Sequence, residues 1–162
     1  DFPRRTENPV VLWERAGALT KIIEEHKPAA EKIRDLQWME DRFWTWIHYG
    51  AQRLGRGELY ETLDFLSFLR AHVLAPLLAA KKNLPPRGMR KVERYSQRED
   101  LDVLRTTVPD GYDPRECERA LRASAKMYVG LRETLAQEEL ERNRRAEMSA
   151  MSYLHEVSEK LK

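Results

Sequence analysis

Apolar residues recur every three or four positions through most of this chain, which is the spacing of one buried face on an α-helix. The first such stretch opens at Pro28 and is closed by Gly55 and Gly57, which supply the backbone freedom of a helix C-terminus. The pattern predicts one long helix with a single buried stripe. Its stripe consists of Ile33, Leu36, Met39, Phe43, Trp46, Ile47, Gly50 and Leu54.

A second helical pattern runs from Glu58 towards Lys81. Its stripe is wider than the first, so we expect this helix to be buried on most sides. Pro76 lies late in the pattern and has no backbone N–H, so it should kink the helix or end its regular part. The apolar positions are Leu59, Leu63, Phe65, Leu66, Phe68, Leu69, Val73 and Leu77.

A strong helix start follows at Asp113, an N-cap residue with Pro114 at the first helical position and Glu116 at the capping-box position. The amphipathic pattern then continues to Gln137, and a more highly charged helix follows up to the last residue. One or two short helices are expected between residues 89 and 108. Together the patterns predict an all-α fold, an up-and-down bundle of three to five helices.

Only the segment from Val10 to Trp13 departs from the helical spacing. It is rich in β-branched residues and precedes Gly17, which is suited to a turn, so we predict one short buried strand. A lone strand leaves its backbone groups unpaired, and its sheet partners would therefore lie outside this chain. The alternative is an extended arm that lies over the helices. We divide the chain into residues 1–27, a bundle at 28–137 and a charged helix at 138–162.

The composition narrows the possible functions. Apolar residues make up 41% and charged residues 35%, and the net charge is only +2. Basic and acidic side chains are mixed, without the basic stripe of a nucleic-acid-binding protein. Cys117 is the only cysteine, which excludes an internal disulfide and is typical of a reducing cytoplasm. There is no run of about 18 apolar residues, so we expect a cytoplasmic protein without a membrane or nucleic-acid partner.

The stretch from Trp38 to Arg70 holds the best candidates for chemistry, because it sets three of the four tryptophans among acids. Glu40, Trp44 and His48 are four residues apart and would share one helix face, offset from the apolar stripe. Carboxylates attract ammonium groups, and an indole offers a flat wall that also binds cations. This face would suit a polar, cationic ligand that contains rings. The alternative is a solvated face on which a neighbouring element covers Trp44.

Further charged candidates lie at the junction of the two helices and beyond it. Arg56 could bind a phosphate, and Glu58 could be a ligand contact or an ordinary carboxylate at a helix start. Asp64 would need a partner if buried, and a structural ion pair with Arg70 is the alternative role. The Asp100-Leu101-Asp102 triplet matches a two-metal pattern only weakly, and we predict no metal site in this chain.

The Trp38–Arg70 stretch resembles the helical half of the aminoglycoside adenylyltransferases, particularly those that modify streptomycin at the 6-position. The segment from Val10 to Trp13, with Gly17, is similar to the last strand and turn of that family's catalytic domain. The resemblance covers about the first 95 residues. Its matching positions are Asp41 with Phe43-Trp44, then Leu54, Arg56 and Glu58, then Asp64 with Leu66, and finally Arg70 with Leu77-Leu78.

The resemblance implies transfer of a nucleoside monophosphate, such as AMP from ATP, to a hydroxyl of a small polar acceptor such as an aminoglycoside. It implies a role in antibiotic resistance. Mg²⁺ and the nucleoside triphosphate would be bound by an N-terminal α/β nucleotidyltransferase domain that this chain does not contain. Residues 1–27 would be the end of that domain. Where the family usually has Glu before Phe-Trp, this chain has Arg42, so Asp41 and Glu40 are the candidate general bases. The candidate substrate-binding residues are Trp44, His48, Arg56, Glu58 and Asp64.

A different class of function is also consistent with these patterns. Small helical proteins are paired with minimal nucleotidyltransferases in toxin–antitoxin systems, and such a non-enzymatic partner module would explain a bundle without a catalytic motif. It would not explain the predicted strand, for which an independent module has no use.

Overall fold

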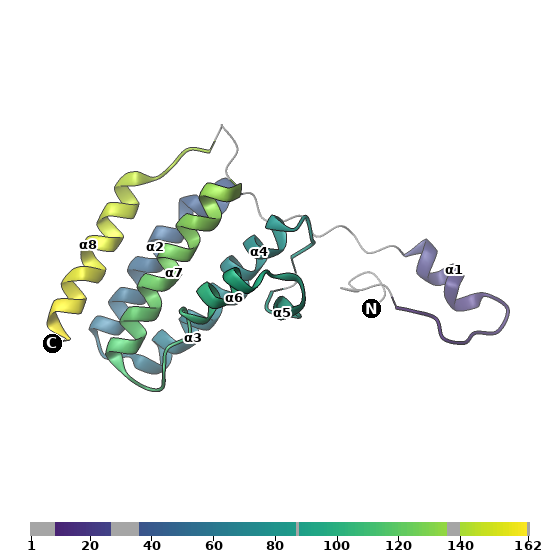
Figure 1. Cartoon of the computed structure of the whole chain (residues 1–162), viewed down its shortest axis with the longest axis horizontal. Helices are drawn as coiled ribbons and strands as arrows, with labels where there is room; N and C mark the ends of the chain where they lie inside the picture. Colours follow the sequence, from purple (N-terminus) through teal and green to yellow (C-terminus); the bar gives the residue numbers. More distant parts are fainter. Residues whose placement is uncertain (1–8, 27–35, 87, 136–139, 162) are drawn as a thin grey trace. The chain divides into compact units, whose positions relative to one another are not determined.

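The computed structural model describes residues 9–26, 36–86, 88–135 and 140–161. Every regular element within these ranges is a helix (Figure 1), so the predicted all-α class is confirmed for them. The chain divides into two compact units, Asp1–Glu31 and Lys32–Lys162. The second unit contains both the bundle and the last helix, which we had assigned to separate segments.

The described part of the first unit holds one helix and no strand. Helix α1 spans Ala18–Glu25 and begins after Gly17, whose φ of 71° fits the expected turn. The strand predicted at Val10–Trp13 is not formed in this chain, and Leu12 is 94% exposed. The physical reason is that a lone strand has no neighbouring strand to complete its backbone hydrogen bonds. The predicted strand needed sheet partners from outside this chain.

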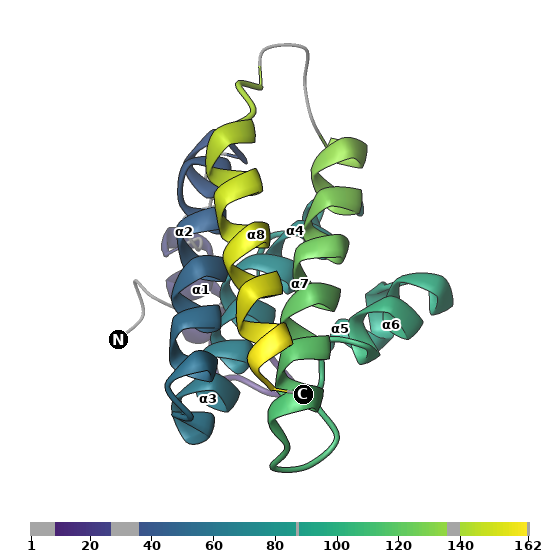
Figure 2. The ribbon, with the colours of Figure 1, turned by 90° about the vertical axis from the view of Figure 1, so that its left-hand side faces the viewer.

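The second unit is built around its three longest helices. Helix α2 packs against both α7 and α8, and Figures 1 and 2 show the three side by side. Helices α3 and α4 contact α7 on the other side of the bundle. The elements are α2 (Leu36–Gly55), α3 (Leu59–Leu69), η2 (Arg70–Leu74), α4 (Ala75–Lys81), α5 (Val92–Tyr95), α6 (Arg98–Arg105), α7 (Pro114–Leu135) and α8 (Arg144–Lys160).

The predicted helix boundaries are confirmed at two places. Helix α2 ends at Gly55, and Gly57 takes a left-handed φ of 75°. Helix α7 begins at Pro114, where the Oδ1 atom of Asp113 accepts a hydrogen bond of 2.7 Å from the Arg115 backbone N–H. Glu116 departs from the capping box, since its carboxylate accepts the N–H of Asp110 instead. These ends set the lengths of α2 and α7.

Pro76 interrupts the second predicted helix, as expected. Between α3 and α4 the backbone forms a short π-helix, η2, in which the Ala75 N–H donates to the Arg70 carbonyl. A proline cannot donate to the carbonyl four residues earlier, and a π-turn lets the helix continue past it. The break therefore widens the helix at Arg70–Leu74 and does not end it.

The helical stretch Leu59–Lys81 is long and apolar enough, by length and composition, to cross a membrane. Half of its apolar window is buried inside the structure. The prediction that the second helix is buried on most sides holds for residues 73–79, which are all buried, but not for α3, where Tyr60, Asp64 and Ser67 are exposed.

The close packing of α2 against α3 and α7 allows a stability prediction at Gly50. A Cβ atom there would lie 2.7 Å from Cδ2 of Leu121 and 3.0 Å from the Phe65 ring. We therefore expect Gly50→Val to lower the free energy of unfolding by about 1–3 kcal/mol through overpacking. Gly130, which has open space around it, provides the control.

Gly130→Val should change the stability by only about 0.5 kcal/mol, since it alters helix propensity alone. Chemical denaturation measures both variants. Equal effects of the two substitutions would contradict the packing described at Gly50.

Candidate functional site

Glu40 is fully buried and accepts hydrogen bonds from four directions. Its Oε2 atom accepts the Tyr128 hydroxyl at 2.8 Å, and its Oε1 atom accepts Nη1 of Arg132 at 2.9 Å. Trp44 Nε1 and the backbone N–H of Asn143 both donate to Oε1 at 3.2 Å. A buried carboxylate is tolerated when a cation and several donors satisfy it, and Glu40 meets that condition.

Arg132 extends this network to α8. Its Nη1 atom also lies 3.1 Å from Oε2 of Glu147, in the first turn of α8. Burial works to lower the pKa of Arg132, but the hydrogen bonds to Glu147 and Glu40 raise it. Burial and the hydrogen bond to Glu40 raise the pKa of Tyr128 far above its usual value, so its hydroxyl stays a donor. The network joins α2, α7 and α8.

Trp44 lies in the same buried region. It is 2% exposed, and its ring meets the Tyr128 ring edge-on with centroids 6.0 Å apart. Phe43 stacks on Tyr128 at 3.7 Å. We expected Glu40, Trp44 and His48 to form one ligand-binding face. The structure corrects this expectation, because Glu40 and Trp44 are core residues. Partners on α7, far along the sequence, make burial of Glu40 possible, and the periodicity of α2 alone could not reveal them.

The other two candidates on α2 are exposed. His48 stacks on Tyr153 of α8, with ring centroids 4.5 Å apart. Asp41 accepts a hydrogen bond of 2.8 Å from Nε2 of Gln37. Of the two candidate bases, only Asp41 is accessible to a ligand.

Arg56 and Glu58 form an exposed ion-pair cluster at the turn between α2 and α3. Oε2 of Glu58 accepts Nη1 of Arg53 at 2.8 Å and Nη2 of Arg56 at 3.0 Å. Arg53 also reaches Glu61 at 3.3 Å. Glu40 is separated from this turn by most of α2, about 22 Å at 1.5 Å per residue. The structure therefore does not bring Glu40 together with Arg56 and Glu58.

The cluster predicts a specific acid response. The hydrogen bonds from Arg53 and Arg56 lower the pKa of Glu58. A carboxylate with a lowered folded-state pKa stabilises the fold above its unfolded pKa, and this contribution is lost as pH falls through the folded value. We expect Glu58→Gln to lose less stability than the wild type below the usual carboxylate pKa.

Thermal unfolding midpoints between neutral and acid pH measure this effect. Glu156→Gln is the matched control, because Glu156 is exposed on α8 and has no resolved pKa shift. The interpretation is wrong if both variants follow the wild-type acid curve.

The remaining acidic candidates have different surroundings. Asp64 is exposed on α3 and does not pair with Arg70, whose guanidinium instead donates to the Thr107 carbonyl at 2.7 Å. Burial lowers the pKa of Arg70. Asp100 accepts Nζ of Lys81 at 2.9 Å, so the weak two-metal triplet contains a structural ion pair. Among the residues that the structure describes, no cluster of three or more His, Cys, Asp or Glu could hold a metal ion.

A row of rings on α2, α3 and η2, all but one of them partly buried, was not predicted as a unit. We call it the aromatic surface. It consists of Trp38, Trp46, Tyr49, Phe65, Phe68 and the exposed ring of His72. Its ring centroids lie 5.7 Å apart for Trp38–Trp46 and Trp46–Phe68, 5.8 Å for Phe68–Phe65, 5.0 Å for Phe65–Tyr49 and 4.7 Å for Phe68–His72.

Charged groups border the aromatic surface. The guanidinium of Arg42 lies 4.4 Å from the centre of a Trp38 ring, and that of Arg53 lies 4.5 Å from the Tyr49 ring. On α3, Asp64 is one helical turn before Phe68 and shares its face. Flat rings with a carboxylate and guanidinium groups at the edge can hold a ring-containing polar ligand, or another protein domain.

Two spacings in the sequence could have identified this surface. Trp38, Arg42 and Trp46 are four apart on α2, and Asp64, Phe68 and His72 are four apart along α3 and η2. One ring from each row, Trp46 and Phe68, had been assigned to a buried stripe. Periodicity alone does not distinguish a side chain that a neighbouring helix covers only in part from a side chain that is fully buried.

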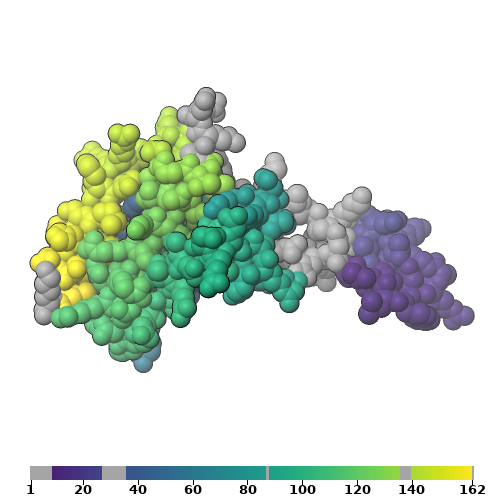
Figure 3. Space-filling view, in the orientation of Figure 1, coloured from purple at the N-terminus to yellow at the C-terminus, as the bar shows by residue number. Residues whose placement is uncertain are grey.

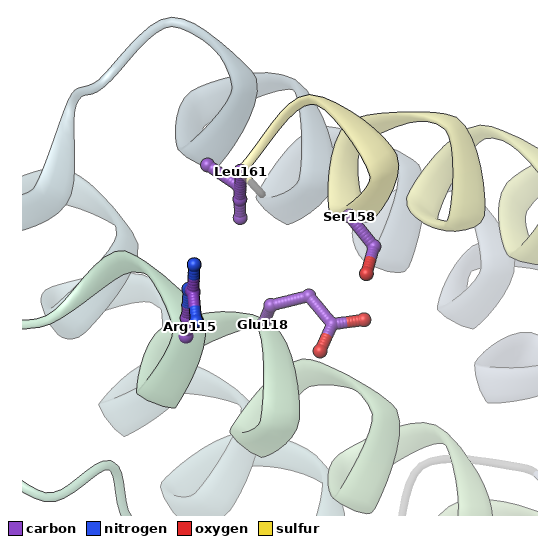
Figure 4. A pocket seen from close by; sticks show the side chains of 4 residues that line it. All are labelled: Arg115, Glu118, Ser158 and Leu161. Carbon is purple, nitrogen blue, oxygen red and sulfur yellow. The ribbon is translucent and has the colours of Figure 1, made fainter.

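Two pockets lie elsewhere in the second unit. One, of about 230 Å³, lies between the start of α7 and the end of α8. Figure 4 shows Glu118 and Ser158 facing each other across it, with Arg115 and Leu161 beside them. Glu118 also forms an ion pair with Arg122, which lies on the same helix. The other, of about 200 Å³, is lined by residues of the loop after α4 and of α5.

Comparison with protein-family models, curated proteins and solved structures finds no match for this chain.

Proposed function

We propose that this chain is the helical half of a nucleotidyltransferase-like enzyme that transfers a nucleoside monophosphate to a hydroxyl of a small polar acceptor. The observation that carries the proposal is the aromatic surface, with Asp64 and Arg42 at its border, in the stretch that resembles the adenylyltransferases. Aminoglycosides are the acceptor class that this chemistry fits. Their rings would lie on the aromatic surface and their ammonium groups would meet carboxylates.

In the proposed reaction, the acceptor hydroxyl oxygen attacks the α-phosphorus of the nucleotide. The bond to the β-phosphate breaks, and pyrophosphate leaves. The hydroxyl proton passes to a carboxylate. We assign this role to Asp41, which is exposed and lies three residues from Trp38 on α2, and not to the buried Glu40.

The nucleotide and Mg²⁺ would be held by a domain outside this chain. The residues that the structure describes do not fit a metal site, since they contain no cluster of three potential ligands. The exposed Val10, Leu12 and Trp13 support the idea of a missing neighbour, because they have the composition of a buried strand. In the proposed enzyme these residues would complete the sheet of the catalytic domain.

Assays of the proposed longer polypeptide, in which a catalytic domain would precede this chain, test the proposal. The enzyme is incubated with ATP, Mg²⁺ and aminoglycosides including streptomycin, and mass spectrometry detects acceptors that have gained a nucleoside monophosphate. Transfer that needs both Mg²⁺ and the acceptor is the expected result.

Two results would contradict the proposal. The first is an upstream sequence without a Gly-Ser and D-x-D pattern together with no transfer to any acceptor. The second is purification of the chain as a separate polypeptide bound to a nucleotidyltransferase, which would favour the non-enzymatic partner module.

A further inference from the structure

The side-chain amide of Gln37 contacts the carboxylate that we assign as the base of the proposed transfer. Gln37 lies one turn before Asp41 on α2, and its Nε2 atom donates to Oδ1 of Asp41 at 2.8 Å. Within the described part of the chain, this is the one hydrogen bond that the Asp41 carboxylate accepts. The Gln37 amide therefore decides how this exposed carboxylate is oriented.

The Gln37 amide is held by a segment that is far away in sequence. Its Oε1 atom accepts the backbone N–H of Glu141 at 2.9 Å, and its Nε2 atom donates to the Glu141 carbonyl at 3.1 Å. A primary amide has two N–H donors, so Nε2 can serve this carbonyl and Asp41 together. Turning the amide over would place a donor against a donor and an oxygen against two oxygens. One orientation of Gln37 thus satisfies three hydrogen bonds, and the other satisfies none of them.

The backbone that holds Gln37 is itself anchored. Two residues after Glu141, the backbone N–H of Asn143 donates to the buried Glu40 at 3.2 Å. Asn143 is also the N-cap of α8, which packs along α2. Figure 2 shows the start of α8 beside the start of α2, and Figure 3 shows the start of α8, in yellow-green, at the surface of the molecule. The Gln37 amide is therefore fixed between two elements of the bundle.

A fixed carboxylate is an advantage for a general base. The base must lie within hydrogen-bond reach of the hydroxyl whose proton it takes. An exposed aspartate without a partner would move between several rotamers. Because Gln37 holds Oδ1 of Asp41, the Oδ2 atom keeps one direction and remains available for the hydroxyl. Orientation of this kind contributes to the rate of a reaction.

We propose that Gln37 is a positioning residue for the base of the transfer reaction, an inference that rests on the proposed function. In this step the acceptor O–H bond breaks, and its proton goes to Oδ2 of Asp41. The electron pair of that bond forms the new bond to the α-phosphorus. Pyrophosphate leaves with the electrons of the bond to the bridging oxygen. Gln37 would touch neither the acceptor nor the nucleotide, and it acts by keeping Asp41 in place.

NMR of the 162-residue chain tests the contact between the two side chains. Asp41→Ala removes the acceptor of one Gln37 N–H, so the signal of the Gln37 side-chain amide should shift. The side-chain amide of Gln52, which is partly buried on the same helix, is the reference and should not shift. A shift at Gln37 no larger than that at Gln52 would overturn the contact and the positioning role with it.

Steady-state kinetics of the proposed nucleotidyltransferase test the role in catalysis. Gln37→Met keeps the approximate length of the side chain and removes the amide. It should lower kcat by about tenfold, which is part of the roughly 100- to 10,000-fold that a positioned base supplies. The acceptor KM should stay within about twofold, since Gln37 does not bind the acceptor. Gln52→Met is the matched control and should leave both constants unchanged.

A double-mutant cycle separates positioning of the base from a general loosening of the fold. In an Asp41→Asn background the base is absent, so the addition of Gln37→Met should lower kcat no further. The positioning role is overturned if Gln37→Met lowers kcat equally in both backgrounds, or if it leaves kcat unchanged and raises KM. Absence of transfer by the unsubstituted enzyme would instead overturn the proposed function, and this role would fall with it.

Discussion

Replacing Glu40 with alanine is expected to lower the free energy of unfolding by about 3–5 kcal/mol, because it removes a buried carboxylate that accepts hydrogen bonds from four donors, among them the buried Arg132. Arg132 is 3% exposed, and Glu40 lies 2.9 Å from its Nη1 atom. The substitution also removes the acceptor of the Tyr128 hydroxyl and of the Asn143 backbone N–H. Because Asn143 is the N-cap of α8, the contact between α8 and α2 should weaken first.

Asp41→Ala is the matched control for this prediction. Asp41 is the next residue on the same helix, and its exposed carboxylate accepts only the side chain of Gln37 among the hydrogen bonds of the described residues. Its replacement should change stability by no more than about 0.5 kcal/mol. Chemical denaturation compares the two, and hydrogen exchange of the α8 amides reports where the fold opens. Similar losses for both variants would show that Glu40 does not hold the three helices together.

The second large effect is expected at Asp64. In the proposed nucleotidyltransferase, Asp64→Asn should lower kcat/KM for the acceptor by about 10- to 100-fold, the value of one charge-assisted hydrogen bond to a bound ligand. Because Asp64 is exposed, the stability of the Asp64→Asn variant should remain close to that of the wild type.

Asp102→Asn serves as the control for Asp64→Asn. Asp102 is an exposed aspartate on α6 and lies outside the stretch that carries the aromatic surface. Steady-state kinetics with varied acceptor concentration measure both variants. An unchanged kcat/KM for Asp64→Asn would remove this residue from the site, and an equal fall in both would indicate a general effect of charge.

The helices could be predicted because their signals are local. The spacing of apolar residues, the Asp113 cap and the break at Pro76 each act within one or two turns, and the structure contains all three. The strand at residues 10–13 could not be decided in this way. Its formation depends on a sheet partner, which no local signal describes.

The candidate site shows the same division between local and distant information. Periodicity grouped Glu40 with Trp44 correctly but gave them a ligand-facing role, because Tyr128 and Arg132 are about 90 residues away in sequence. Conversely, Trp46 and Phe68 were assigned to the core, whereas both are only partly buried and pack against its edge. Which apolar residues stay accessible depends on how two helices pack, and a single helical pattern does not contain that information.

The central claim is that the functional face of α2 is the aromatic surface and not the face of Glu40 and Trp44. NMR of the tryptophan indole N–H groups in the full-length protein tests it most directly, since the side chains compared are Trp38, Trp44 and Trp46 of the same helix. Addition of the proposed acceptor, an aminoglycoside such as streptomycin, should shift the signals of Trp38 and Trp46 and leave Trp44 unchanged. A shift of Trp44 without change at Trp38 and Trp46 would contradict the claim.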